Sequence, residues 1–498
     1  MASTTMEQNN QYNSAKIWQI GLFALNNTAT NMYLFIIGFV AYYATGIAGL
    51  TVVAVSAVIG LSRVLDAITD PIIGFIIDKT ESKFGKFRPM MVIGNVILAS
   101  SVLIMYNVTH LLPEVWQLPF FILLYALYII GYTFQTACTK AAQTVLTNDP
   151  KQRPLFSAFD AAYNIVVFTG GQVFVANYLV AKHGDFTMAL FTELNMFAIV
   201  LAGLFTILAV FAIKGRDRKE YYGLAGENVE TRFRDYWPIL KGNRPLQMLV
   251  IAASTDKVAT MVLRQPAVYI MFFGIVLGDY ALSGTFSMIT IVPSLLITIF
   301  GVRLASKTSL KNALVKATWV GLITAAILMA LFLLVDPSLI SLNNIGFATI
   351  LFIVFYCLLR GIETLTPAIV IPMIADVADY ETYRTGRFVP GMMGTIFSFI
   401  DKVMSAMAPA LVGIVVAMIG YKDEFPQLGE ALTTPLLIAT LILIFGIPIL
   451  GWIISLIAMK FYGLDDKKMV EIQTEITRVR EQITTAKEKK AAAASKKV

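Results

Sequence analysis

Long apolar runs recur along the whole chain and constrain its fold more than any other feature. A membrane-crossing helix needs about 20 predominantly apolar residues, and we identify twelve such stretches. Hydrophobic residues make up 57% of the 498 residues and charged residues only 14%, which is low for a water-soluble protein. Because the backbone must satisfy its own hydrogen bonds in hydrocarbon, the runs are expected to be helices. The sequence therefore predicts an all-α membrane protein.

The twelve expected spans differ in length, and several exceed what a bilayer requires, which predicts tilt or extension beyond it. In chain order they cover residues 17–43, 48–78, 90–108, 117–147, 155–181, 188–213, 246–275, 281–304, 312–334, 345–376, 390–419 and 433–461.

Lysine and arginine alternate sharply between the connections that join these spans. Odd-numbered connections contain few of them, chiefly Lys182 and Lys422, whereas even-numbered ones contain clusters such as that at 79–88. Since cytoplasmic loops carry the excess of positive charge, both termini are expected in the cytoplasm. The formal net charge of +7 thus follows the membrane topology and does not indicate nucleic-acid binding.

The longest basic connection divides the chain into two halves of equal span number, which is typical of transporters built from repeats. We expect an N-terminal six-helix bundle over 1–213, a cytoplasmic linker over 214–245 and a C-terminal six-helix bundle over 246–461.

The remaining residues, 462–498, are expected to form a cytoplasmic tail with one amphipathic helix. Apolar residues recur there at helical spacing, at Met469, Ile472, Ile476, Val479 and Ile483. A solvated helix that simply leaves the membrane is favoured over a regulatory one.

The sequence lacks the motifs that are typical of several other classes of protein. Cys138 and Cys357 lie within apolar runs, so no disulfide framework is expected, and His110 and His183 form no metal-binding motif. No cleavable signal peptide, Walker A loop or nucleophile–base set is recognisable. The sequence therefore predicts neither an enzyme nor an ATP-driven pump, and no cofactor.

The second span carries charged residues that hydrocarbon tolerates poorly. Arg63, Asp66 and Asp70 fall on one face of a helix, and the two carboxylates are one turn apart, where like charges repel. Pro71 also leaves the carbonyl of Ala67 without its helical donor. Oxygen atoms so arranged suit a small hard cation such as Na⁺, or the carboxylates must take up protons. The alternative is an ion-pair lock in which Arg63 neutralises one aspartate.

Further ionisable residues lie at membrane depth in other spans. They are the cations Lys140, Lys257, Arg264, Arg360 and Lys402, and the anions Asp160, Asp256, Glu363 and Asp401. Arg360 and Glu363 are three residues apart and are expected to neutralise each other. If a bound cation satisfies Asp66 and Asp70, positive charge is in excess, which favours an anionic substrate. Lys140, Lys402 and Arg264 are its predicted contacts.

Two charged segments are candidates for gating. One is residues 78–89 after the second span, and the other is residues 375–391 after the tenth, where Asp376, Asp379 and Glu381 precede Arg384. Salt bridges between the halves at these cytoplasmic positions could close the inner side and break when it opens. The alternative is an ordinary solvated charged loop.

The chain resembles the glycoside–pentoside–hexuronide:cation symporters, the group of the major facilitator superfamily that contains the melibiose permease. Three long segments carry most of the resemblance, and NRPL at 243–246 also fits. They are RVLDAITDPIIGFIIDKTESKFGKFRP at 63–89, MIADVADYETYRTGRF at 373–388 and FIDKVMSAMAPALVGIVVAMIGY at 399–421.

The resemblance implies symport driven by Na⁺, H⁺ or Li⁺ through alternating access, and it assigns roles to particular residues. Asp66 and Asp70 match the pair that binds the coupling cation, together with a threonine that Thr133 matches. Lys402 matches a lysine near both cation and sugar, and Arg63 matches a residue near the inner gate.

Departures from the family pattern concern the sugar site. The acids that bind galactosides in the melibiose permease fall at Asn26 and Thr136 here, and a nearby tryptophan falls at Lys140. These changes favour an anionic glycoside, a hexuronide or a sulfonated sugar, carried across the plasma membrane. A neutral glycoside, a non-sugar organic solute and an uncoupled facilitator remain alternatives.

Overall fold

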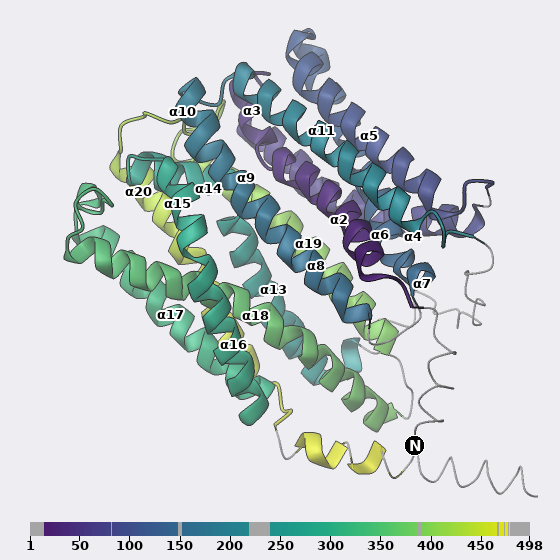
Figure 1. Ribbon diagram of the computed structural model, residues 1–498. Coiled ribbons are helices and arrows are strands. Elements are labelled where there is room, and N and C mark those ends of the chain that lie inside the picture. Colours follow the sequence, from purple (N-terminus) through teal and green to yellow (C-terminus); the bar gives the residue numbers. More distant parts are fainter. Residues whose placement is uncertain are drawn as a thin grey trace, which may run out of the picture. The chain divides into compact units, whose positions relative to one another are not determined.

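The computed structural model describes residues 14–80, 82–147, 152–218, 240–385, 390–465, 468–472, 474–476 and 478 (Figure 1). Within these ranges every regular element is a helix. Twelve of the helical segments are long and apolar enough to cross a membrane. The predicted all-α fold with twelve spans is therefore confirmed for the described residues.

The first six spans are built from continuous helices and from helices joined without a loop. The elements are α2 (Ile17–Ile37), α3 (Val40–Gly46), α4 (Val52–Lys79), α5 (Phe87–Val108), η1 (Thr109–Leu111), α6 (Glu114–Ala141), α7 (Gln143–Leu146), α8 (Arg153–Ile165), η2 (Val166–Gly170), α9 (Gly171–Val173), η3 (Phe174–Leu179), α10 (Val180–His183) and α11 (Met188–Ile213).

The second six spans include the longest helix, α18, which extends beyond what a bilayer requires. The elements are α13 (Arg244–Leu263), α14 (Pro266–Tyr269), η6 (Ile270–Val276), α15 (Ala281–Ile289), α16 (Ile291–Lys307), α17 (Leu310–Leu334), η7 (Pro337–Leu339), α18 (Phe347–Thr385), α19 (Pro390–Met418), α20 (Thr434–Leu441), η8 (Ile442–Gly446) and α21 (Ile447–Lys460).

Two predicted spans end earlier than the sequence suggested. The helix expected over 246–275 stops at Leu263, because Pro266 has no N–H to continue the ladder and instead begins α14. The helix expected over 117–147 stops at Ala141, and a turn at Ala142 leads into the short α7. Span 7 is thus discontinuous near its middle.

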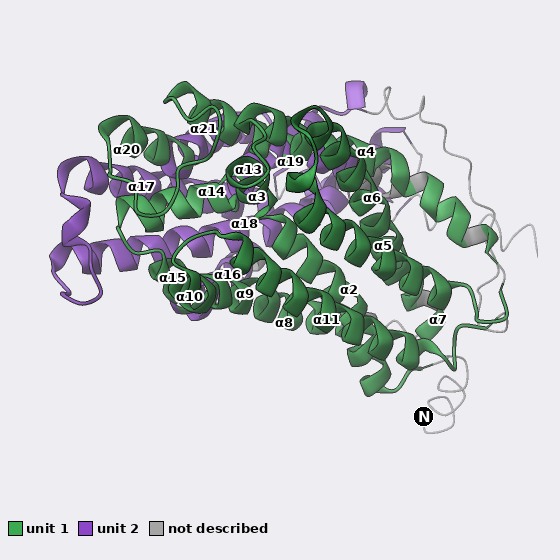
Figure 2. Cartoon of the chain, turned by 90° about the horizontal axis from the view of Figure 1, so that it is seen from above, with its two compact units in different colours: residues 1–228, 262–288, 405–443 green, residues 229–261, 289–404, 444–498 purple. Residues whose placement is uncertain are grey.

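The chain divides into two compact units, coloured separately in Figure 2. Unit 1 comprises residues 1–228, 262–288 and 405–443, and unit 2 comprises residues 229–261, 289–404 and 444–498. Segments of the second half of the chain therefore belong to unit 1. The predicted bundles over 1–213 and 246–461 stay a prediction, and most of the predicted linker lies outside the described residues.

In unit 1, α11 packs along α2 and α5, and α6 packs against both α5 and α4. Glycines permit this close approach, since a Cβ on Gly131 would lie 3.0 Å from the side chain of Leu98. One core cluster joins Phe23, Met91, Cys138 and further buried residues of these helices. This packing holds α4 against α6, which brings the polar residues of the two helices together.

The tail is not a solvated segment in the part that the structure describes. Residues 468–472 and 474–476 are helical, and Ile472 and Ile476 are buried in the core cluster of unit 2. Their partners in that cluster include Leu246 at the start of α13 and Val377 in α18. Burial of apolar surface at about 25 cal/mol per Å² favours docking of this helix over its solvation.

Candidate functional site

The clearest polar cluster at membrane depth joins α4 and α6 in unit 1. Thr133 places its Oγ1 3.1 Å from Oδ1 of Asp66 and 2.9 Å from the carbonyl oxygen of Ile129. Oγ1 of Thr69, one turn from Asp66, lies 3.1 Å from Oγ1 of Thr133. Asp66 is only 4% exposed and Thr133 is fully buried. The structure thus brings two residues of the predicted cation site together.

The hydroxyl oxygen of Thr133 can face either a proton or a cation, depending on where its own proton is donated. Its single hydroxyl proton has two acceptors within reach, Asp66 and Ile129. When the proton is donated to Ile129, the Thr133 oxygen and the Asp66 carboxylate face each other without a proton between them. Hydroxyl, carbonyl and carboxylate oxygens are the ligands that small hard cations prefer. The arrangement is chemically suited to holding either a cation or a proton.

Asp70 and Arg63 lie on α4 close to Asp66, four residues after it and three before it. Residues so spaced share one face of a helix, and both side chains are partly buried. Arg63 interacts electrostatically with Asp66, which agrees with the predicted shared face. It also interacts with three tyrosines of α6, namely Tyr125, Tyr128 and Tyr132.

Thr69 is a residue of this cluster that sequence reasoning missed. It lies between Asp66 and Asp70 and follows Asp66 by three positions, so its hydroxyl shares their helix face. The same hydroxyl also donates to the backbone carbonyl of Asp66 at 3.2 Å. The signal in the sequence was a hydroxyl residue, Thr69, placed one helical turn after Asp66 in a membrane span.

Two of the predicted substrate residues have hydrogen-bond partners on α6. Asn26 of α2 is fully buried and donates through Nδ2 to the carbonyl of Gln135 at 3.3 Å and to Oγ1 of Thr139 at 2.8 Å, both on α6. Thr136 is partly buried and donates to the carbonyl of Thr133 at 3.2 Å. Asn26 therefore fastens α2 to α6 in this structure, and its role in substrate binding stays a prediction.

The three predicted cationic contacts lie in different surroundings. Lys140 is exposed in the last turn of α6, because that helix ends at Ala141, and so it lies nearer the end of the span than predicted. Arg264 is exposed at the break between α13 and α14. Lys402 is partly buried within α19. Discontinuous helices commonly line transporter substrate sites, which gives Arg264 a suitable position.

Unit 2 pairs most of its membrane charges internally. Lys257 of α13 contacts Asp401 of α19, with Nζ and Oδ1 2.8 Å apart. Arg360 and Glu363 of α18 pair at 2.5 Å, which confirms the expected neutralisation. Asp256, next to Lys257 in the sequence, has a different partner and accepts a hydrogen bond from Trp452 Nε1 at 2.9 Å.

The C-terminal end of α18 carries the predicted gating residues of the second half. Glu381 is 1% exposed, pairs with Arg384 at 2.9 Å and accepts from Nδ2 of Asn243 at 2.9 Å. Asp376 and Asp379 are partly buried on the same helix. Glu381 thus joins α18 to the beginning of α13 within unit 2. The predicted salt bridges between the two halves stay a prediction.

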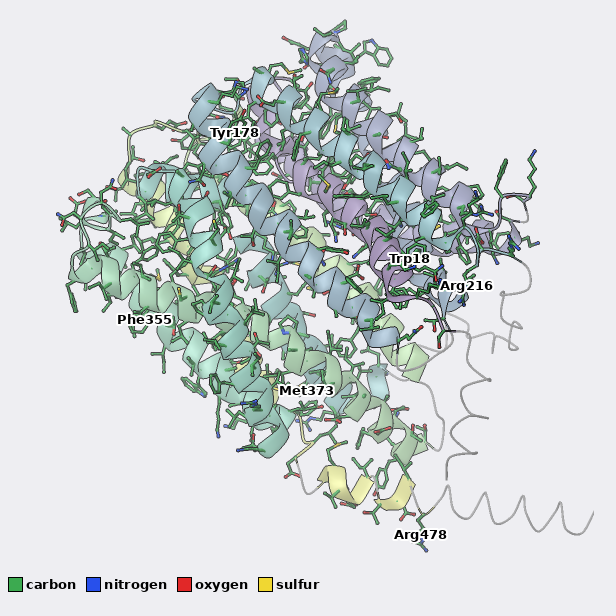
Figure 3. The ribbon with its side chains drawn as sticks, in the orientation of Figure 1. Trp18, Tyr178, Arg216, Phe355, Met373 and Arg478 are labelled. Carbon is green, nitrogen blue, oxygen red and sulfur yellow. The ribbon has the colours of Figure 1, made fainter. Side chains whose placement is uncertain are left out.

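Another buried carboxylate, Asp217, caps the start of α5 in unit 1. It accepts from the backbone N–H groups of Lys86, Phe87 and Arg88 at 2.9–3.1 Å. The neighbouring Arg216 donates to the carbonyls of Leu146 and Ser14 (Figure 3). A negative charge at the start of α5 is favourable, since the free N–H groups of a helix point there. This capping contact joins segments about 130 residues apart and has no local sequence signal.

At the other end of unit 1, segments 262–288 and 405–443 pack against helices of the first half. Gln172 of α9 donates to the hydroxyl of Tyr280 at 3.2 Å, and Tyr42 of α3 donates to the carbonyl of Pro426 at 3.0 Å. Burial raises the pKa of Tyr280, so its hydroxyl stays neutral in this contact. By the predicted topology this is the extracellular end.

The fold agrees with comparisons to known proteins. A family model described as MFS/sugar transport protein matches residues 19–466. The chain is 25% identical to a putative glycoside/cation symporter, YagG, of Escherichia coli (strain K12), over 88% of this chain and 90% of that protein. It is 23% identical to a glucuronide carrier protein homolog of the same organism, over 91% and 94% of the two chains.

Among solved structures, the fold is similar to that of the nucleoside transporter NupG. The TM-score is 0.60, and the match covers 90% of this chain and 99% of that one at 11% sequence identity. At that identity the likeness concerns the fold alone.

Because the family model spans most of the chain, the protein belongs to the MFS/sugar transport family. It is a multi-pass membrane protein and a transporter of the major facilitator superfamily, not an enzyme.

Proposed function

We propose that this symporter couples entry of an anionic sugar-type solute, such as a glycoside of glucuronic acid, a hexuronide or a sulfonated sugar, to a gradient of Na⁺ or H⁺. It would act by alternating access in the plasma membrane, with both termini in the cytoplasm. The observation that carries the proposal is the buried contact between Asp66 and Thr133. A carboxylate held by hydroxyls at membrane depth needs a positive partner.

The coupling cation binds at Asp66 and Asp70, with Thr133 and the newly identified Thr69 supplying hydroxyl oxygens. Arg63 supplies positive charge when the cation is absent, because it interacts electrostatically with Asp66. Arrival of a cation removes the need for that interaction, and Arg63 is then released. A cation that binds one conformation better than the other shifts the equilibrium between them, which is how binding drives movement.

An anionic substrate is supported by the cationic side chains that lie in or next to the spans of the second half. Lys257 and Arg360 are already paired with carboxylates, so they are poor candidates for substrate contact. Lys402 and Arg264 stay candidates, with Lys140, Asn26 and Thr136 as further predicted contacts. The similarity to a glucuronide carrier homolog supports the same substrate class.

Gating is proposed at both ends of the molecule. At the extracellular end, the contacts of Tyr42 with Pro426 and of Gln172 with Tyr280 hold the outer side closed within unit 1. At the cytoplasmic end, Arg63, Asp376, Asp379 and Arg384 take part in opening and closing the inner side. The pairing of Arg384 with Glu381 represents one of its states.

Uptake into proteoliposomes tests the proposal. Accumulation of p-nitrophenyl β-glucuronide is expected to exceed that of the matching glucoside and to require an inward Na⁺ or H⁺ gradient. Asp66→Asn should abolish gradient-driven accumulation, whereas Asp336→Asn, at an exposed turn outside the spans, should leave it unchanged. Equal accumulation of both glycosides would refute the anionic substrate, and accumulation without any gradient would refute coupling.

A further inference from the structure

Asp256 is an intramembrane carboxylate that the proposed cation site does not use. It lies on α13 and accepts a hydrogen bond of 2.9 Å from the indole Nε1 of Trp452 on α21. Trp452 is 2% exposed, and a Cβ on Gly321 of α17 would lie 3.2 Å from its ring. The indole is therefore held firmly in place, and its N–H stays directed at the carboxylate.

Around Asp256, the nearby positive charges are committed elsewhere. Lys257, the next residue, pairs with Asp401 at 2.8 Å, and Arg360 pairs with Glu363. Thr260 donates to the backbone carbonyl of Asp256, whereas Trp452 is the one hydrogen-bond partner of its carboxylate among the described residues, and it is a neutral donor. A carboxylate at membrane depth without a cationic partner is costly in its ionised form.

The other ionisable residues of the surrounding helices lie towards the helix ends or on another helix. The charged ones are Arg244 at the start of α13, Arg303 and Lys307 at the end of α16, Lys311 and Lys316 at the start of α17, Asp376, Asp379, Glu381 and Arg384 towards the end of α18, Lys460 at the end of α21, and Lys402 on α19.

Glu363 adds negative charge to the surroundings of Asp256. It is 8% exposed, and the two carboxylates interact electrostatically. One Glu363 oxygen pairs with Arg360, while the other, Oε1, is buried and has no hydrogen-bond partner among the described residues. Two carboxylates that interact electrostatically, with one arginine paired to Glu363, leave one negative charge to be compensated.

We propose that Asp256 is a proton-binding site of the C-terminal half. The reaction is simple protonation, in which the carboxylate takes a proton from hydronium and releases water. A metal ion is a poor alternative at this position, because the indole that faces Asp256 is a donor only and cannot ligate a cation. The protonated carboxyl is neutral and needs no cationic partner, which fits the surroundings described above.

The assignment deepens the proposed function, on which its role in transport rests. If Asp256 exchanges its proton between the two conformations of the cycle, H⁺ movement would be linked to sugar entry through unit 2. The cation site at Asp66 would then not be the sole point at which the protein responds to pH.

Trp452 provides a direct reporter for the test. In a variant whose other tryptophans, Trp18, Trp116, Trp237 and Trp319, are replaced by Phe, Trp452 fluorescence is followed from about pH 5 to about pH 9. A single transition is expected, because the indole changes from facing a carboxylate to facing a neutral carboxyl. Asp256→Asn in this background should abolish it. Asp336→Asn, at an exposed turn outside the spans, should retain it.

Infrared difference spectra of the wild-type protein provide a measurement that does not depend on the fold of the Asn variant. A carboxylic acid C=O band should appear on acidification and should shift in Asp256→Glu, which keeps an ionisable group. A Trp452 transition that persists in Asp256→Asn, or the absence of any transition, would overturn the proposal.

These titrations require neither substrate nor an ion gradient. Failure of the proposed symport would show in the proteoliposome assay, whereas failure of proton binding at Asp256 would show here. The two outcomes are therefore distinguishable.

Discussion

Two intramembrane aspartates, Asp66 in unit 1 and Asp256 in unit 2, are held by different kinds of donor. Asp66 lies beside the hydroxyls of Thr133 and Thr69, whereas Asp256 receives an indole N–H from Trp452. A hydroxyl oxygen can turn a lone pair towards a cation, and an indole nitrogen cannot. This difference indicates that the site at Asp66 can hold either a metal ion or a proton, whereas the site at Asp256 is suited to a proton alone.

The two sites also differ in how nearby cations are arranged. Arg63 interacts electrostatically with Asp66 itself, so a positively charged side chain is available to Asp66 when no coupling ion is bound. In unit 2, Lys257 and Arg360 are paired with other carboxylates. Competition between Arg63 and a cation is therefore possible at Asp66, and Asp256 has no equivalent competitor among the described residues.

Breaking the Arg360–Glu363 pair should have the largest effect on stability. Glu363→Gln leaves the arginine without its counter-charge, and a broken buried pair costs about 3 kcal/mol. Thermal unfolding of the purified protein in detergent measures this loss. Thr364→Ala, which alters an exposed neighbour on the same helix, serves as the control. Equal stability of the two variants would show that the pair does not support unit 2.

Removing the docked tail side chain should have a somewhat smaller effect. Ile472 is fully buried in the core of unit 2, and Ile472→Ala should lower the unfolding free energy by about 2 kcal/mol. Val470→Ala, at an exposed position of the same helix, should change it little. Cation affinity at Asp66 should be unaffected in both variants, and a large change in that affinity would indicate that the sites are coupled through the tail.

Replacing Thr133 sharpens the contrast between the two aspartates. Thr133→Val removes the hydroxyl beside Asp66 at nearly constant volume and should raise the cation concentration needed for half-maximal uptake by about tenfold. The Trp452 fluorescence transition should remain as it was. If the cation requirement does not change, the hydroxyl is not a ligand.

The smallest expected effect is the loss of the Glu471 contacts of the tail helix at acidic pH. Hydrogen bonds from Lys468 and Tyr383 lower the pKa of Glu471 below its ordinary 4.5. These hydrogen bonds therefore stabilise the folded protein fully above pH 4.5. Their contribution is lost as the pH falls through the lowered pKa of Glu471. Hydrogen exchange of residues 468–476 should therefore increase only in strongly acidic solution. Glu471→Gln should show no such acid-dependent increase.

Much of the fold was predictable because each span is encoded locally. Length and apolar content fix the twelve helices, and the spacing of Arg360 and Glu363 on one helix fixes their pairing. The break in span 7 at Pro266 was also encoded locally, in a residue without an N–H, although the apolar run concealed it.

The partners that come from distant parts of the chain were not predictable from their spacing. Trp452 lies 196 residues from Asp256, and Asp217 lies about 130 residues from the helix that it caps. Such contacts depend on which helix faces pack together, and an apolar run does not specify that. The pairing of Asp66 with Thr133 was reached through family resemblance, whereas Thr69, although local, was overlooked because the carboxylates dominate the pattern.

The central claim is that Asp66 and Asp70 bind the coupling cation, and replacing both with asparagine tests it most directly. The double variant is reconstituted in proteoliposomes, and solute accumulation is measured with and without an inward Na⁺ or H⁺ gradient, with Asp336→Asn as the control. We predict that the double variant equilibrates the solute at most and no longer responds to either gradient, while the control accumulates it. Accumulation by the double variant that still rises with the ion gradient would contradict the account.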